Sequence, residues 1–362
     1  MNADASGHVV WRVFASPQRF GAYFVGSALS NIGTWCQNLA GILLIYALTG
    51  STLIVGLITV AQFAWPIVLA PLAGAVADRA DRRGVLVAIQ IAGAVIAGLL
   101  SAVTIAGSVT VELALVAVAL LGILMAFQVP AQLALIPSLV APGQAELGLT
   151  LGSAQYNLAR AIGPIVASAV IATWGVGAAF VLNAASYVVY ALALWLVRPA
   201  PVDRSAGSAR RGVVAHVLFG SRIVLPLFAL AFLASAAAEV VTTLGPAMSV
   251  VVAGDEGWTG LFISGFGAGA VVGALAVAPA LRRVRRRLPW ALGVEAVGGV
   301  VFAVSILAGS ALAALAGTVL IGLGFIVGVN RTLAIVQSMV PPDVIGRVTA
   351  WWLVAFLGGR VA

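Results

Sequence analysis

Long, continuous apolar stretches occupy most of this sequence. A helix crosses the roughly 30 Å hydrocarbon core of a bilayer with about 20 apolar residues, and only helices and closed barrels satisfy their backbone there. The stretches do not alternate between polar and apolar residues, which favours helices over barrel strands. Their approximate bounds are 20–48, 53–77, 84–106, 110–138, 147–172, 175–197, 223–252, 258–281, 288–308, 311–339 and 345–362. The sequence therefore predicts an all-α polytopic membrane protein with ten complete helices and the start of an eleventh.

The composition excludes several classes of protein. The chain is 62% hydrophobic and only 8% charged, and all 19 basic residues are arginine. Without lysine there is no P-loop ATPase site and no Schiff base. With only two histidines, a histidine-built metal site is not expected, and the single cysteine, Cys36, cannot form a disulfide within the chain. We expect no enzyme activity, no catalytic or metal-binding residues and no bound cofactor. The expected partners are a small molecule and the lipid bilayer, with no nucleic acid, and we expect a monomer.

The arginines predict how the chain is oriented. With the N-terminus inside, Arg12, Arg19, Arg79, the cluster between Arg198 and Arg222, and the cluster 282–287 all lie on one side. The opposite loops carry no arginine. Because cytoplasmic loops are enriched in basic residues, we expect a cytoplasmic N-terminus.

A polar segment, 198–222, divides the chain into an N-terminal half, 1–197, and a C-terminal half, 223–362, and is interpreted as a cytoplasmic linker. Shifting the sequence by 200 residues places Gly122, Ser138, Pro142 and Arg160 on identical residues. This indicates a parallel duplication of a six-helix unit. By the same alignment residue 362 corresponds to residue 162, so about 36 residues of a complete second half would be missing, and we expect a C-terminally truncated chain.

Several motifs resemble those of a known family. The sequence GAVADRADRR, residues 74–83, resembles the signature between helices 2 and 3 of the major facilitator superfamily, matched by Gly74, Asp78, Arg79, Arg82 and Arg83. The stretches SNIGTWCQNLA (30–40), LTGST (48–52) and LARAIGP (158–164) are similar to the bacterial enterobactin-exporter and macrolide-efflux branch. This resemblance implies two six-helix halves in a bacterial cytoplasmic membrane.

The resemblance also assigns a role to the loop. It implies that Asp78 contacts the cytoplasmic start of helix 11 and helps to close an inner gate. The positive end of a helix stabilises a facing carboxylate by about 0.3–1 kcal/mol. Helix 11 would start near PPDVIGR, residues 341–347, with Asp343 as a candidate N-cap and Arg347 as a further partner. The alternative interpretation is a basic loop that only sets the topology.

Four ionisable residues are expected to lie within the membrane: Arg160, Glu239, Glu295 and Arg331. Charges inside a membrane are costly, so such residues are functional candidates. Glu239 and Arg160 are candidates for proton and substrate coupling, because burial favours a protonated carboxyl group and a nearby arginine favours the charged form. For Glu239, a structural role remains the alternative. Glu295 and Arg331 are expected at equal depth on neighbouring helices, which favours a structural ion pair.

Uncharged residues complete the candidates. Asn31, Thr34 and Asn38 share one face of the first helix, and Asn157 lies on the same face of helix 5 as Arg160. These side chains either line a polar cavity or join helices. Gly163 and Pro164 form the helix 5 motif that the resemblance associates with exporters. Gly265, Gly269 and Gly273 recur every fourth residue, which predicts close helix packing.

Taken together, these features predict a secondary active transporter that works by alternating access. The branch resemblance favours a proton-coupled efflux pump, driven by the proton gradient, for a hydrophobic or amphiphilic molecule such as a drug or a siderophore. The alternatives are an importer or symporter of the same superfamily and a truncated, inactive membrane fragment.

Overall fold

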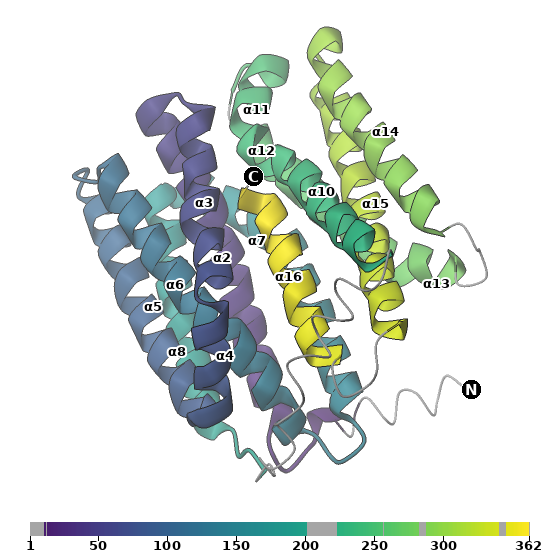
Figure 1. The fold of residues 1–362 in the computed structure, drawn as a ribbon. Coiled ribbons are helices and arrows are strands. Elements are labelled where there is room, and N and C mark those ends of the chain that lie inside the picture. The colour runs from purple at the N-terminus through teal and green to yellow at the C-terminus, as the bar shows by residue number, and fades with distance from the viewer. Residues whose placement is uncertain are drawn as a thin grey trace. The chain divides into compact units, whose positions relative to one another are not determined.

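The structure is a computed structural model that describes residues 11, 13–200, 223–255, 257–281, 287–339 and 345–361. Within these residues every regular element is a helix (Figure 1). Nine of the described helices are long and apolar enough to cross a membrane, and two shorter apolar helices span Thr52–Val68 and Trp351–Val361. The predicted all-α polytopic architecture is thus confirmed.

The chain divides into two compact units. Unit 1 contains the described residues of Met1–Thr49 and Val68–Val202, and unit 2 contains those of Gly50–Ile67 and Asp203–Ala362. The sequence-based division assigned everything up to residue 197 to the first half. The structure differs from it over residues 50–67, which pack with unit 2. Most of the expected linker, from residue 201 to 222, lies outside the described residues.

Unit 1 is a helical bundle in which α2 packs against α7 and α8, and α5 packs against α6 and α8. Thr110 begins α6 by accepting a hydrogen bond from the Leu113 backbone N–H at 3.3 Å. Gly175, at φ 80°, forms the tight turn between α7 and α8. The elements are α2 (Phe20–Thr49), α4 (Ala70–Arg79), α5 (Arg82–Ile105), α6 (Val111–Leu135), the 3₁₀-helix η1 (Ile136–Leu139), α7 (Ala145–Trp174) and α8 (Val176–Leu196).

Buried amides hold the helices of unit 1 together. Asn183 Nδ2 on α8 donates to Gln37 Oε1 on α2 at 2.7 Å. Gln90 on α5 accepts from the Ser30 hydroxyl at 3.4 Å and donates to Gln128 on α6 at 3.3 Å. Hydrogen bonds of this kind join helices in a lipid environment, where hydrophobic attraction between helices is weak.

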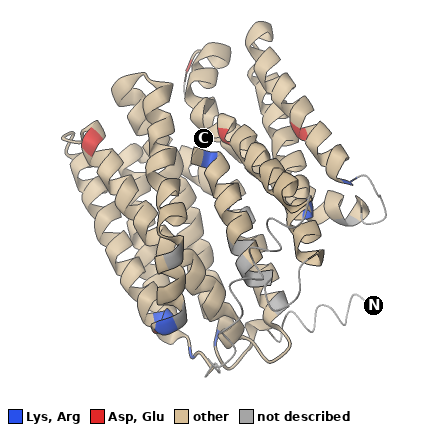
Figure 2. Cartoon of the chain, in the orientation of Figure 1, with Lys and Arg blue, Asp and Glu red and all other residues tan. Residues whose placement is uncertain are grey.

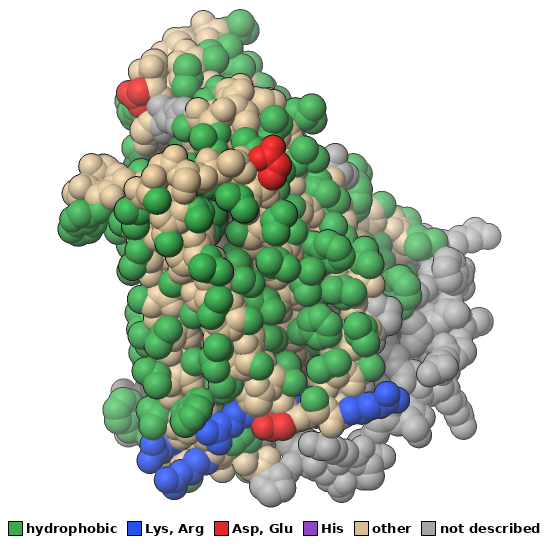
Figure 3. All heavy atoms as spheres, turned by 90° about the vertical axis from the view of Figure 1, so that its left-hand side faces the viewer, with side chains coloured by type: hydrophobic (Ala, Val, Ile, Leu, Met, Phe, Trp, Pro, Cys, Tyr) green, Lys and Arg blue, Asp and Glu red, His purple; other side chains and the backbone are tan. Residues whose placement is uncertain are grey.

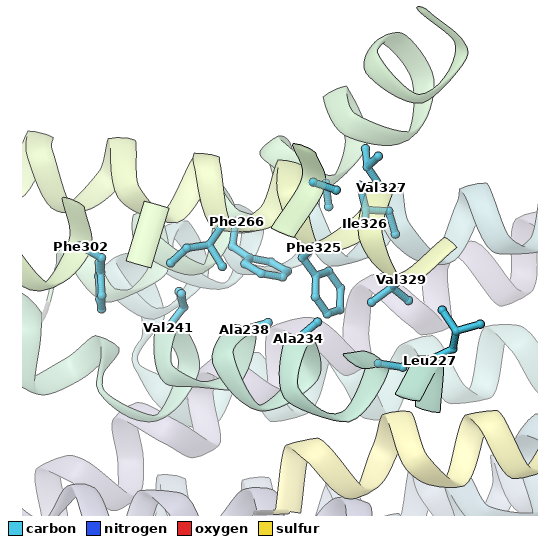
Figure 4. Close-up of a cluster of buried hydrophobic side chains, with 14 of the residues drawn as sticks. Leu227, Ala234, Ala238, Val241, Phe266, Phe302, Phe325, Ile326, Val327 and Val329 are labelled. Carbon is cyan, nitrogen blue, oxygen red and sulfur yellow. The ribbon is translucent and has the colours of Figure 1, made fainter. Parts of the chain in front are cut away.

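In unit 2, α15 is the central helix, and it packs against α10, α12 and α14. Its Phe325 ring lies 5.3 Å from that of Phe266 on α12, within the cluster of buried side chains shown in Figure 4. The last helix, α16, packs mainly against α10. The elements are α3 (Thr52–Val68), α10 (Val224–Thr243), α11 (Gly245–Ala253), α12 (Trp258–Val272), the π-helix η3 (Gly273–Val277), α13 (Ala278–Ala280), α14 (Arg287–Ala308), α15 (Ala311–Ser338) and α16 (Ile345–Val361).

Glycines allow α12 to approach α15 closely. A Cβ at Gly269 would collide with the Val319 carbonyl, and Gly265 and Gly273 also face α15. From the other side, a Cβ at Gly322 on α15 would collide with the Phe266 carbonyl. The predicted packing role of the repeated glycines is confirmed.

Two of the apolar runs are each divided into two helices. The run 53–77 breaks at Leu69, between α3 and α4, where Pro71 occupies the first turn of α4. The run 223–252 breaks at Leu244, before the pair Gly245-Pro246 that begins α11. Proline has no backbone N–H and is favoured in the first turn of a helix, so both breaks coincide with a new helix start.

Apolar side chains cover the outer surface of the helices. On α5, Ile91, Val95 and Leu99 are each more than half exposed and recur every four residues, whereas Leu86 and Ala97 are fully buried. Figure 3 shows a face on which hydrophobic side chains extend between one end where basic side chains gather beside an acidic one and the opposite end, which carries acidic side chains. Such a surface suits the hydrocarbon core of a bilayer.

Candidate functional site

The residues of the loop signature lie at the junction of α4 and α5. Gly74 and Asp78 are in α4, and the exposed Arg79 is its last residue. A Cβ at Gly74 would meet no described atom within 4 Å, so packing within the described residues does not require glycine there. The Asp78 side chain is not among the side chains that the structure describes.

Arg82 and Arg83 bind the ends of other helices. Arg82 Nη1 donates to the carbonyl of Ala134, in the last turn of α6, at 3.1 Å. Arg83 Nη2 donates to the carbonyl of Trp195, near the end of α8, at 2.8 Å. The last carbonyls of a helix lack helical partners and carry partial negative charge, so a cation there is favourable. These arginines therefore fasten three helices of unit 1 to one another.

Asp81 begins α5, a role that sequence reasoning missed. Its carboxylate accepts hydrogen bonds from the backbone N–H groups of Arg83 and Gly84, at 3.2 and 3.0 Å. Aspartate is a favoured N-cap residue, and Asp81 lies three residues before the apolar run that begins at residue 84, so the sequence did contain the information.

The proposed partner of Asp78 cannot be placed. Residues 341–344 and the Arg347 side chain lie outside the described residues, and α16 is described from Ile345. The contact between Asp78 and the start of helix 11 stays a prediction.

A buried ion pair connects α10 and α16 in unit 2. Arg360 Nε lies 3.8 Å from Glu239 Oε2, and the two side chains are 6% and 11% exposed. Figure 2 shows how few residues of the described helices are charged, and within this pair each charge compensates the other. The sequence identified Glu239 but not this partner, although the 200-residue repeat relates Arg360 to Arg160.

Aromatic rings surround the Arg360 guanidinium. Its central carbon lies 4.6 Å from the centroid of Phe63 on α3 and 5.8 Å from that of Phe356 on α16. Phe356 in turn stacks on Trp352, with ring centroids 5.4 Å apart. A guanidinium over an aromatic face gains a cation–π attraction that grows when water is excluded.

Arg160, the corresponding arginine of unit 1, is also buried against an aromatic ring. It is 6% exposed, and its guanidinium carbon lies 5.0 Å from the centroid of Trp35 on α2. The sequence-based hypothesis grouped Arg160 with Glu239. The structure instead gives Glu239 an arginine of its own unit.

The expected ion pair between Glu295 and Arg331 is not formed in the structure. The closest approach of α14 and α15 places Gly324 against Glu295 and Gly328 against Ala291. In this antiparallel register, Arg331 lies level with Leu288, about 10 Å along the helix from Glu295. The expected equal depth was obtained by counting residues from the ends of the two helices. This count fails because the end of α15 extends beyond the start of α14, so the two ends are not level.

The remaining candidates of unit 1 occupy different surroundings. Asn31, Thr34 and Asn38 are half-buried on α2, and the Thr34 hydroxyl donates to the Ser30 carbonyl at 2.9 Å. The Asn157 side chain is not described. Gly163 allows α7 to contact α2: a Cβ there would collide with Trp35, and its carbonyl accepts a bond from the Cys36 thiol at 3.1 Å. Pro164 follows within α7.

Apolar helices of membrane length, arranged in two compact units, define a polytopic membrane protein. Residues 23–362 match the family model of the Major Facilitator Superfamily. The chain belongs to this superfamily of secondary transporters. Its members are generally not enzymes.

Solved structures share this fold at low sequence identity. The chain resembles an inward-facing, unoccupied bacterial homolog of the human lysosomal transporter Spinster, with a TM-score of 0.77, 14% identity and coverage of 95% of this chain and 81% of the other. It resembles the nucleoside transporter NupG with a TM-score of 0.70 and 13% identity, over 94% of this chain and 88% of the other. It also resembles a D-xylose-proton symporter, with a TM-score of 0.73 and 13% identity, over 95% of this chain and 88% of the other. Among curated proteins no match was found.

Proposed function

We propose that this transporter is a proton-coupled efflux pump of the bacterial cytoplasmic membrane, with its N-terminus in the cytoplasm. Its substrate would be a hydrophobic or amphiphilic small molecule, of the drug or siderophore type. The observation that carries the proposal is the buried pair of Glu239 and Arg360, 3.8 Å apart between two membrane helices. Intramembrane charges mark ion and substrate pathways in transporters.

The chemistry of the pair suits coupling. Protonation of Glu239 would remove its electrostatic attraction for Arg360. The guanidinium would then be able to bind another anion or to stack on an aromatic ring. Phe63 and Phe356 already supply such faces. A proton and an amphiphilic substrate can thus compete for the same cluster, and this competition is what exchange requires. The proton gradient is the proposed energy source, and no bound cofactor is needed.

Export, rather than import, is supported by the resemblance of residues 30–40, 48–52 and 158–164 to the efflux branch. A symporter is the second candidate, because one of the structural neighbours is a D-xylose-proton symporter. The two differ in the direction in which a proton gradient moves the substrate.

The test is transport by the purified full chain in proteoliposomes, with erythromycin and enterobactin as probes and with each sign of pH gradient. We expect substrate movement against the direction of proton flow, and Glu239→Gln should reduce it at least tenfold. Glu112→Gln, at the exposed start of α6, is the matched control. Movement in the same direction as the protons would establish symport. Movement that is unaffected by any pH gradient would contradict the proposal.

A further inference from the structure

Glu295 is a buried acid that the proposed coupling pair does not use. It lies in the middle of α14 and is 6% exposed. Neither of its carboxyl oxygens has a hydrogen-bond partner among the described residues. In this respect it differs from Glu239, which faces a guanidinium.

The packing of α14 against α15 explains this isolation. A Cβ at Gly324 would lie 2.5 Å from the Glu295 backbone nitrogen and 2.9 Å from its Cα. One turn further along α14, Gly298 is in similarly close contact with Gly317 and Ile321. Two helices in backbone contact on both sides of a residue leave water little access to it.

The charged groups on the neighbouring elements do not reach Glu295. On α15 the only described charge is Arg331, level with Leu288 and about 10 Å away along the helix. On α10 it is Glu239, which is held by Arg360, and α11 carries no charged residue. Within α14 itself, Arg287 lies eight residues earlier, about 12 Å along the helix. No described cation lies within ion-pair distance of Glu295.

A bare carboxylate in these surroundings would cost several kcal/mol, whereas a neutral carboxylic acid costs far less. We propose that Glu295 is a proton-binding site of unit 2, occupied by a proton at neutral pH. The equilibrium is simple: the carboxylic acid releases one proton when water reaches it and becomes a carboxylate. Glu239 differs from it in facing the guanidinium of Arg360, 3.8 Å away.

If the proposed proton coupling is correct, this site is a second proton-binding group of the transporter, besides the Glu239 and Arg360 pair at which proton and substrate compete. Opening of the contact between α14 and α15 would hydrate Glu295 and release the proton, and closure would favour its recapture. This role rests on the proposed function, whereas the occupancy of the site by a proton does not.

Infrared spectroscopy of the purified full chain tests the occupancy directly. At neutral pH the wild type minus Glu295→Gln difference spectrum should contain the carbonyl stretch of a protonated carboxylic acid. The same band should persist in Glu239→Gln. Glu295→Leu, which also removes the acid, serves as a second variant in case the glutamine variant does not fold. A difference spectrum that contains only carboxylate bands would overturn the proposal.

Transport measurements test the role. Glu295→Gln should retain substrate exchange in the absence of a gradient. The factor by which a pH gradient stimulates its transport should fall at least tenfold. Glu239→Gln should lose the exchange itself. A full pH response in Glu295→Gln, with Glu239→Gln inactive, would overturn the transport role of Glu295 and leave the proposed function standing. A sodium gradient that drives transport in the wild type, together with a carboxylate spectrum, would overturn both.

Discussion

Arg360 is stabilised by two kinds of contact, an ion pair with Glu239 and the ring face of Phe63. Arginine suits such a place because its guanidinium is planar, weakly hydrated and always charged. Removal of either residue should lower the stability of the fold, since the remaining buried charge would have no compensating partner.

This reasoning predicts the effect of removing one or both charges. Arg360→Met should destabilise unit 2 by about 3–5 kcal/mol, because it leaves Glu239 buried and uncompensated. The double variant Glu239→Gln/Arg360→Met should be less destabilised than Arg360→Met alone, although it carries one more change. Denaturant unfolding in detergent measures both free energies. If the loss of stability in the double variant equals the sum of the losses in the two single variants, the two charges do not interact.

The sequence predicted which residues are buried and charged better than it predicted their partners. Arg160, Glu239 and Glu295 were identified as intramembrane charges, and all three are buried. Their pairings were wrong or untested because side-chain contact depends on helix register, which hydropathy does not encode. The repeat relates Arg160 to Arg360, and it was the only sequence signal that pointed to Arg360 as a buried arginine of unit 2.

At the scale of helices, the junction of α4 and α5 is held by hydrogen bonds to helix ends. Asp81 caps the start of α5, while Arg82 and Arg83 bind the ends of α6 and α8. The signature thus has a structural function within unit 1, independent of any contact that Asp78 makes.

Removing these contacts should loosen unit 1. Arg82→Gln should lower the free energy of unfolding by about 1–2 kcal/mol, because it removes charge-assisted bonds to the Ala77 and Ala134 carbonyls. Arg79→Gln is the matched control: it removes the same charge from an exposed site at the end of α4, three residues before α5 begins. Unfolding in detergent compares the two variants. Identical losses would mean that charge, and not the bonds to the carbonyls, is responsible.

The glycines of α15 give a second prediction at this scale. Gly322→Ala should destabilise unit 2 by about 1–3 kcal/mol or more, because its Cβ would collide with the Phe266 carbonyl. Gly299→Ala on α14 should be neutral or slightly stabilising, since a Cβ there meets no described atom within 4 Å. Thermal unfolding of both variants, each compared with the wild type, is the measurement. A stable Gly322→Ala variant would contradict the close packing of α12 and α15.

Helix positions were predicted well, and helix breaks less well. Hydropathy found every apolar run because burial in lipid demands continuous apolar sequence. It merged α3 with α4 and α10 with α11, because a break at Leu69 or Leu244 does not interrupt the hydrophobicity. Pro71 and Gly245-Pro246 were the available signals.

At the scale of the whole chain, the division into units depends on contacts that sequence order does not reveal. Residues 50–67 precede most of unit 1 in the sequence but pack with unit 2, where Phe63 contacts Arg360. The chain passes from unit 2 to unit 1 between Ile67 and Val68, directly before the break at Leu69. A linker search based on composition finds the polar segment after residue 197 and has no means of detecting this exchange.

The orientation of the chain is the last prediction, and it follows from the distribution of arginine. With the N-terminus inside, the loop between α5 and α6 faces outward and the loop between η1 and α7 faces the cytoplasm. Single cysteines at Ser108 and Ala141, which are both exposed, report these two loops in a Cys36→Ser background. A membrane-impermeant maleimide added to intact cells should label Ser108→Cys and should label Ala141→Cys only after permeabilisation. The reverse pattern would place the N-terminus outside, and the arginine-rich loops would then face the side where the positive-inside rule does not place them.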